Sequence, residues 1–327
     1  MRPNDTAATP ARIPAPRPAA RPAPVAAAPA ADLSLAGCPP PPYHPPPASP
    51  PWHPATLVPD AALPPAPPPV RRSASLSALA GKGMWIWRFP DADHGDPVAV
   101  VADAKRAGLR QLWVRVGDSQ AGFYGAPSLA ALVPVAHANG IAVIGWGFPY
   151  LFDPVADAAW TGQALAWRAP DGQGLDGFSA DIETADEGVA LSPQRTEVYL
   201  GLVRRAFPKV LMVGTVFPPN DHFWATYPYA SIAAYVDALA PMVYWGCDQP
   251  AADVAVALQR LRPLAPVHVI GQAYSMGDVG GRQPSPSPTE ISTFLLAARS
   301  GGAVGASLWS WQSIDADEWA ALSSYRW

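Results

Sequence analysis

The sequence lacks several features that define whole classes of protein. It has two cysteines, Cys38 and Cys247, which excludes a disulfide framework and a cysteine-rich metal site. We interpret Cys247 as a buried thiol. The six histidines are scattered, with no pair at a metal-ligand spacing such as HxxxH, so we expect no metal ion and no other cofactor. No apolar run reaches the roughly 18 residues of a transmembrane helix, and none is expected.

Positive charge is also scarce in most of the chain. Residues 1–78 carry six Arg and three Asp, which leaves 16 basic and 23 acidic residues for 79–327. A net negative domain is a poor ligand for nucleic acid or for an anionic membrane. Neutral substrates such as sugars fit better, and the 13 tryptophans provide flat rings on which sugars can stack.

Proline, by contrast, is abundant at one end of the chain. Residues 1–72 hold 24 of the 43 prolines, mixed with alanine, as in PPPPYHPPPASPPWHP. Such a composition cannot build a hydrogen-bonded core, so we predict a disordered segment or linker over 1–78. The tetrapeptide LAGC, which ends at Cys38, resembles a lipoprotein cleavage box. We therefore expect a secreted or cell-envelope protein.

Beyond residue 78 the sequence alternates between apolar runs and helix-like stretches. Helical patterns such as DPVAVVADAKRAG and SPQRTEVYLGLVRRAF separate the runs, and this alternation indicates parallel βα units. Eight units in about 250 residues match the (β/α)₈ barrel. We predict this α/β barrel over 79–327, with a doubly wound sheet as the alternative, although no glycine-rich phosphate loop follows the first strand. The predicted strands are 84–89, 111–117, 141–148, 177–183, 210–217, 239–246, 268–275 and 304–312.

The fourth predicted strand carries two carboxylates inside an apolar stretch. Alternation along a strand puts Ser179, Asp181 and Glu183 on one face and the intervening apolar residues on the other. The Cα atoms of the two acids are then roughly 7 Å apart. Two like charges this close raise the pKa of one carboxyl and create a proton donor. Glu183, nearest the strand end, is the predicted donor, and Asp181 the stabilising anion. The structural alternative is a salt bridge from this pair to Arg115.

Active sites of these barrels lie at the carboxyl ends of the strands, and polar and aromatic residues cluster there. Tyrosine and glutamine can hydrogen-bond hydroxyl or amide groups, and tryptophan can support a sugar ring. Tyr244 is a predicted catalytic residue beside the two acids. The predicted substrate-binding residues are Trp309, Trp311, Gln272, Tyr274, Arg115, Trp146 and Ser179.

The segment DGFSADIE resembles the strand-four signature of the glycoside hydrolase family 18 barrels, the chitinase-like enzymes, which is usually written DGxDxDxE. Asp176, Gly177, Phe178, Asp181 and Glu183 fit this pattern, and Ser179 stands where an aspartate is usual.

Two further segments resemble motifs of the same family. PMVYW resembles its MxYD motif, with Tyr244 matching and Trp245 replacing the aspartate. GASLWSW resembles the segment that carries its substrate-floor tryptophan, which assigns that role to Trp309. The family's SxGG motif is not kept, since this chain has VIGWGF. A D-x-E pair with aromatic strand ends is also similar to the family 25 lysozyme-like barrels, which cut peptidoglycan.

The resemblance implies a substrate-assisted retaining mechanism. Glu183 would protonate the glycosidic oxygen, Asp181 would orient the N-acetyl group of the substrate as the nucleophile, and Tyr244 would hold the carbonyl of that group. We therefore predict a monomeric glycoside hydrolase whose partner is a carbohydrate polymer of β-linked N-acetylhexosamine, such as peptidoglycan or chitin. The alternative is a non-catalytic, glycan-binding barrel of chitinase-like shape.

Overall fold

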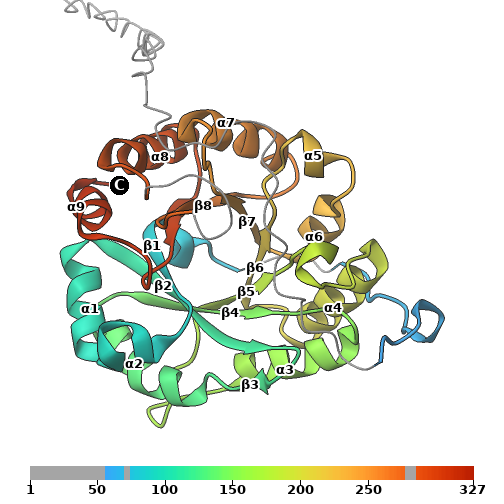
Figure 1. Ribbon diagram of the computed structural model, residues 1–327. Coiled ribbons are helices and arrows are strands. Elements are labelled where there is room, and N and C mark those ends of the chain that lie inside the picture. Colours follow the sequence, from blue (N-terminus) through green and yellow to red (C-terminus); the bar gives the residue numbers. More distant parts are fainter. Residues whose placement is uncertain (1–55, 70–73, 277–284) are drawn as a thin grey trace, which may run out of the picture. The chain divides into compact units, whose positions relative to one another are not determined.

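The structure is a computed structural model that describes residues 56–69, 74–276 and 285–327. In these residues, eight parallel strands close into a barrel that is surrounded by helices (Figure 1). The strands follow one another round the barrel in chain order, and β1 pairs with both β2 and β9, which closes the sheet. The predicted (β/α)₈ barrel is confirmed, and the doubly wound open sheet is excluded.

Each barrel strand overlaps one of the predicted ranges, although β1 begins three residues before its predicted start at residue 84. The strands are β1 (Gly81–Ile86), β2 (Leu109–Asp118), β4 (Ala142–Phe148), β5 (Gly177–Asp181), β6 (Leu211–Val216), β7 (Ala238–Val243), β8 (His268–Gln272) and β9 (Gly305–Trp309). The short strand β3 (Gly122–Phe123) runs antiparallel to the end of β2. The helices are α1 (Pro97–Arg106), α2 (Ala126–Ala138), α3 (Pro154–Ala166), α4 (Pro193–Ala206), α5 (Asp221–Trp224), α6 (Tyr229–Tyr235), α7 (Pro250–Leu261), α8 (Pro288–Ser300) and α9 (Ala316–Ser324).

Prolines of the barrel region mark helix starts. Five of the helices begin at a proline, whose fixed φ suits the first helical position and whose missing N–H would be unbonded there in any case. Asp96 and Asp153 precede two of these prolines, and their side chains accept hydrogen bonds from backbone N–H groups of the first turns. Within the described ranges, no helix has both the length and the apolarity to cross a membrane.

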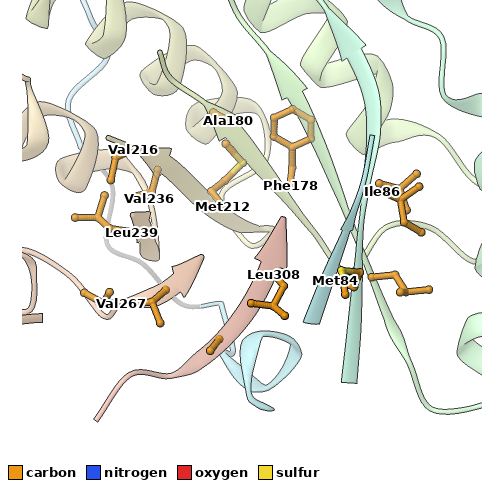
Figure 2. Packing of buried hydrophobic residues seen from close by; sticks show 14 of the residues in the cluster. Met84, Ile86, Phe178, Ala180, Met212, Val216, Val236, Leu239, Val267 and Leu308 are labelled. Carbon is orange, nitrogen blue, oxygen red and sulfur yellow. The ribbon is translucent and has the colours of Figure 1, made fainter. Parts of the chain in front are cut away.

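The apolar side chains form two separate cores. The outer core lies between the strands and the helices, and Figure 2 shows part of it, including Phe178, Met212 and Leu308. The inner core fills the barrel itself and contains Trp85 and Trp113, whose rings stack with centroids 4.6 Å apart. The barrel is therefore a packed core, and only its carboxyl-terminal mouth is left for a site.

A buried ion pair joins α4 to the residue that precedes β7. The side chains of Arg204 and Asp237 are 1% and 3% exposed, and their Nη2 and Oδ2 atoms lie 2.6 Å apart. The Arg204 guanidinium also donates to the backbone carbonyls of Tyr235 and Val210, and Asp237 accepts the N–H of Met212. The pair thus fixes a helix to two strands and satisfies backbone groups that would otherwise be buried without partners.

Residues 56–69 lie against the barrel, although the sequence predicts a disordered spacer over 1–78. Arg195 of α4 forms an ion pair with Asp60 at 2.7 Å and donates to the carbonyl of Val58. The Tyr235 hydroxyl donates to the carbonyl of Pro67 at 2.9 Å. These polar contacts correct the prediction of disorder for residues 56–69. Composition alone could not reveal them, because the contacting side chains belong to the barrel. Residues 1–55 and 70–73 lie outside the described residues.

We expect Arg204→Met to lower the free energy of unfolding by about 3–5 kcal/mol, because it leaves Asp237 charged, buried and without its partner. Arg205→Met is the matched control, since Arg205 is the adjacent, exposed residue of the same helix, and it should change stability by no more than about 0.5 kcal/mol. Urea unfolding of the three chains at pH 7 measures both values. Equal losses in the two variants would contradict a special role for the buried pair.

Candidate active site

Strand β5 presents its polar residues to the barrel and its apolar residues to the helices. Phe178, Ala180 and Ile182 belong to the outer core, and Figure 2 shows the first two beside Met212. Asp181 and Glu183 instead line a cleft at the mouth of the barrel. The predicted alternation is confirmed, and both carboxylates reach the end of the barrel where such folds hold their active sites.

The cleft that contains the two acids has a volume of about 160 Å³. Its other walls come from β1 and from β6 to β9. A volume of about 150 Å³ holds a benzene ring, so the cleft accommodates one sugar ring in part, or an acetamido group, and not a whole drug-sized ligand. The lining residues are Trp85, Asp181, Glu183, Thr215, Met242, Tyr244, Ile270 and Trp309.

Burial raises the pKa of both carboxyl groups. Asp181 is 7% exposed, and desolvation raises its pKa to about 7 even though the positive charge of Arg115 opposes the shift. Among the described residues its Oδ1 atom has no hydrogen-bond partner. The pKa of Glu183 is raised well above its ordinary value, first by desolvation and then by the charges of Asp181 and Glu187. Two adjacent carboxyls with raised pKa values retain a proton near neutral pH, as a general acid requires.

Arg115 does not cap the acids. Its Nη2 lies 3.1 Å from Oδ2 of Asp118 on the same strand, and its guanidinium lies over the ring of Trp146 at 5.4 Å. The predicted structural alternative, a salt bridge from Arg115 to the acid pair, is therefore wrong. Arg115 does not line the cleft either, which corrects its predicted contact with substrate; its effect on the site is the electrostatic one on Asp181.

Beneath Asp181 lies a neutral pair of hydroxyls. The Ser179 hydroxyl is 2.8 Å from that of Thr215 on β6, and both residues are buried. Ser179 was predicted to contact substrate, but its side chain is held by Thr215 below the cleft. Thr215 pairs in register with Asp181 and itself lines the cleft. We did not predict Thr215; its alternate position in the run Leu211–Val216 is the only sequence signal for it.

Tyr244 lines the cleft as predicted, whereas Tyr274, a predicted substrate-binding residue, packs against Tyr244 and does not line the cleft. The two rings meet edge to face with centroids 5.7 Å apart. Burial raises the pKa of Tyr244 well above its ordinary value, so its hydroxyl keeps its proton and can donate a hydrogen bond. Burial, and then the charge of Glu183, raises the pKa of Tyr274 to about 12.

Gln272 is not available to a substrate, which corrects the prediction. It is 1% exposed, its Oε1 accepts the N–H of Gly246 at 2.7 Å, and its Nε2 donates to the carbonyl of Tyr274 at 3.3 Å. Its amide thus ties together the segments that follow β7 and β8. In this way Gln272 helps to position Tyr244 and Tyr274, which those segments carry.

The predicted tryptophans separate into one that lines the cleft and two that do not. Trp309 lines it together with Trp85, which we did not predict. Trp146 is 2% exposed and its indole N–H donates to the carbonyl of Ile86, so it fills the barrel. Trp311 packs edge to face against Trp319 of α9, with centroids 5.0 Å apart. Trp146 and Trp311 pack against other residues of the protein and do not line the cleft, which corrects their predicted contact with substrate.

Two other predictions concern cysteine and metals. Cys247 is disulfide-bonded, which corrects its interpretation as a buried thiol. Cys38, with the lipoprotein-like segment that it ends, lies outside the described residues. Residues 56–69, 74–276 and 285–327 contain no group of three or more His, Cys, Asp or Glu side chains that could hold a metal ion.

We expect Glu183→Gln to stabilise the protein increasingly as the pH rises. Because folding raises the pKa of this carboxyl, the folded chain holds protons that the unfolded chain has released, so the free energy of unfolding falls above about pH 4.3. The free energy of unfolding of the variant should equal that of the native chain near pH 4. At pH 8 it should be higher by roughly 1–3 kcal/mol, which is the usual cost of burying a polar group without all its hydrogen bonds.

Thermal unfolding at both pH values tests this expectation, with Asp186→Asn as the control. Asp186 is an exposed acid of the loop that follows Glu183, and its replacement should leave the pH dependence unchanged. A Glu183→Gln chain whose stability parallels that of the native chain at both pH values would contradict the raised pKa.

Comparison with known proteins gives matches in structure and none in sequence. No family model matches the chain, and no curated protein matches it. A GH18 chitinase from Cycas revoluta, solved in complex with (GlcNAc)3, is similar with a TM-score of 0.53 at 13% identity, over 75% of this chain and 99% of the chitinase. A chitinase from Chromobacterium violaceum is similar with a TM-score of 0.55 at 13% identity, over 76% of this chain and 100% of the chitinase.

The spore cortex-lytic enzyme SleL of Bacillus cereus is also similar, with a TM-score of 0.55 at 12% identity. The match covers 78% of this chain and 75% of SleL. At such low identity a structural likeness shows the fold alone. The chain has the (β/α)₈ barrel fold that the GH18 chitinases have, and it carries an acid pair in a cleft at the mouth of that barrel.

Proposed function

We propose that this protein is a glycoside hydrolase that cleaves a polymer of β-linked N-acetylhexosamine. One observation carries the proposal: Asp181 and Glu183 open together into a cleft walled by Tyr244 and Trp309, instead of being sealed by Arg115. The structural neighbours support the substrate class, since a chitinase with (GlcNAc)3 bound and a spore cortex-lytic enzyme are among them. Peptidoglycan and chitin are the two polymers of this kind that we consider.

In the first step, Glu183 donates its proton to the glycosidic oxygen while the bond from that oxygen to C1 of the sugar breaks. The carbonyl oxygen of the substrate's own N-acetyl group attacks C1 and forms a cyclic oxazolinium ion, in which Asp181 accepts a hydrogen bond from the nitrogen. The Tyr244 hydroxyl donates to the acetyl oxygen and orients it. The ring rests on Trp309.

In the second step, a water molecule attacks C1 from the side that the leaving group has vacated. The Glu183 carboxylate accepts a proton from this water, the bond from C1 to the acetyl oxygen breaks, and the N-acetyl group is restored. The configuration at C1 is therefore retained. Glu183 is protonated again at the end, so the cycle closes without a cofactor.

Two departures from the family 18 pattern change how the site would work. Because Ser179 replaces an aspartate, a neutral hydroxyl pair with Thr215 lies below Asp181, and Arg115 supplies the charge that offsets its desolvation. Because Trp245 is 1% exposed and packs against Phe294 in the outer core, it cannot hold the acetamido group. That task falls to Asp181 and Tyr244.

The proposed substrate lies outside the cytoplasm in most organisms that make it, so the proposal includes export to the cell envelope or beyond. A disulfide at Cys247 supports this part, because disulfides persist in oxidising compartments outside the cytoplasm. Fractionation of cells that express the full chain, followed by immunoblotting, tests it, and protein confined to the cytoplasm would contradict it.

We expect Glu183→Gln to reduce the release of soluble product from purified peptidoglycan or from chitin oligomers by about 10²–10⁴-fold, the usual contribution of a general acid. Asp186→Asn, in the same loop and exposed, should keep native activity. The polymer that the native chain prefers would identify the substrate. If neither polymer is cleaved but one still binds both the native chain and Glu183→Gln, the protein is a glycan-binding barrel and the proposed hydrolysis is wrong.

We also expect Arg115→Met to move the acid limb of the pH–rate profile upward by about one pH unit. Removing the positive charge raises the pKa of Asp181, which must be ionised for the first step, so activity is lost at low pH. Arg110→Met is the matched control, because Arg110 is an exposed residue at the opposite end of the same strand. An acid limb that stays in place would contradict the role given to Arg115.

A further inference from the structure

Glu183 lies beyond the last residue of the strand that leads to it. Strand β5 ends at Asp181, which pairs with Thr215 of β6, and the N–H of Ile182 then donates to the carbonyl of Thr215 at 3.1 Å. Within the described ranges the carboxyl group of Glu183 forms no hydrogen bond. The direction of this side chain therefore depends first on the backbone that carries it.

The hydrogen-bond ladder between β5 and β6 stops just before Glu183. In a parallel pair of this register, the next bond would run from the N–H of Phe217 to the carbonyl of Ile182. In the structure that carbonyl accepts the hydroxyl of Tyr227 at 2.5 Å. A side chain from the segment between α5 and α6 thus holds the peptide group that joins Ile182 to Glu183.

Tyr227 is itself packed firmly. It is buried, and its ring centre lies 4.7 Å from that of Tyr229 and 6.0 Å from that of Phe217. Its N–H donates to the carbonyl of Phe223 in α5 at 2.9 Å. A side chain whose rotamer is locked by packing can hold a neighbouring group in a defined place. The Tyr227 hydroxyl is therefore a fixed donor for the Ile182 carbonyl.

The backbone that follows Glu183 is fixed separately. The N–H of Thr184 donates to the carboxylate of Glu187 at 3.2 Å, and the N–H of Glu187 donates to the carbonyl of Thr184 at 3.2 Å. Glu183 thus lies between two fixed points, the Tyr227 bond before it and this capped turn after it. The first of these is a single neutral hydroxyl, which can be removed without changing any charge.

Tyr227 can act on the reaction only through Glu183. It does not line the cleft, and its hydroxyl proton is directed at the Ile182 carbonyl, so it does not contact substrate. Burial, and then the charge of Glu183, raise the pKa of Tyr227 well above its ordinary value, so the hydroxyl keeps its proton near neutral pH.

We propose that Tyr227 is a positioning residue for the proton donor: its hydroxyl holds the Ile182–Glu183 peptide group and thereby directs the Glu183 carboxyl into the cleft. That Glu183 is the donor rests on the proposed function. Without the hydroxyl, a water molecule would take its place at the Ile182 carbonyl and the peptide group could rotate. Glu183 would then spend less time within reach of the glycosidic oxygen, which slows proton transfer.

Tyr227→Phe removes the hydroxyl and keeps the ring. On whichever of peptidoglycan and chitin oligomers the native chain cleaves, we expect kcat to fall about tenfold with KM little changed, because a misplaced donor slows the chemical step. The basic limb of the pH–rate profile should move down by about half a pH unit, because water at the Ile182 carbonyl reduces the desolvation that raises the pKa of Glu183.

Tyr229→Phe is the matched control. Tyr229 is also buried, and its hydroxyl also donates to backbone carbonyls, but these are the carbonyls of Phe217 and Pro218 and not that of Ile182. This variant loses a similar hydroxyl without touching the peptide group before Glu183, and it should keep the native kcat and pH–rate profile.

Carbon-13 NMR of chains labelled at the glutamate carboxyl carbon tests the placement of Glu183 without any substrate. The signal of Glu183 is the one that is missing from the Glu183→Gln spectrum. Its titration should move to lower pH in Tyr227→Phe and stay in place in Tyr229→Phe, with both chains folded as judged by circular dichroism. If Tyr227→Phe does not fold, the positioning role is wrong, because the hydroxyl is then required by the barrel itself.

The outcomes separate this proposal from the proposed hydrolysis. If the native chain cleaves a polymer and Tyr227→Phe keeps the native kcat and the native titration of Glu183, only the positioning role is overturned. If neither polymer is cleaved, the titration decides alone, and a shift confined to Tyr227→Phe supports the positioning role whereas an unchanged titration overturns it. Equal effects of Tyr227→Phe and Tyr229→Phe would also overturn it, since the loss of either buried hydroxyl would then suffice.

Discussion

Asp181 and Glu183 are carried two residues apart on one strand into a cleft that removes most of the water around them. The loss of hydration raises the pKa of each, and the charge of Asp181 raises that of Glu183 further. If both carboxyl groups were ionised, their repulsion would destabilise the fold. If both were protonated, the site would contain no carboxylate. The site depends on an intermediate condition in which the pair holds a proton near neutral pH.

Residues packed inside the barrel help to maintain this protonation state of the acid pair. Trp146 packs inside the barrel, and its ring supports the guanidinium of Arg115 at 5.4 Å. Asp118 fixes the other side of Arg115, so a permanent positive charge is held near Asp181 without forming an ion pair with it. A direct salt bridge would have sealed the acids, whereas a charge at a distance lowers the cost of the Asp181 anion and leaves the cleft open.

The neutral hydroxyl pair of Ser179 and Thr215 belongs to the same arrangement. A third carboxylate below Asp181 would add another charge to a region that already lacks water, and its proton would be shared with the pair above. With hydroxyls in that place, the proton state of Asp181 depends on burial and on Arg115. Tyr244 lines the same cleft, and its high pKa keeps its hydroxyl a donor over a wide pH range.

The sequence by itself determined the barrel and the strand that carries the acids, because both follow from local periodicity. Alternation along 177–183 fixes which side chains face inward, and the position of Tyr244 and Trp309 at strand ends brings them to the same mouth. Only the tertiary structure decided which polar and aromatic groups are free. Gln272 is occupied by the backbone of Gly246 and Tyr274, and Trp311 by Trp319. These partners come from other segments of the chain, and local sequence patterns do not show which distant residues will be in contact in the folded protein.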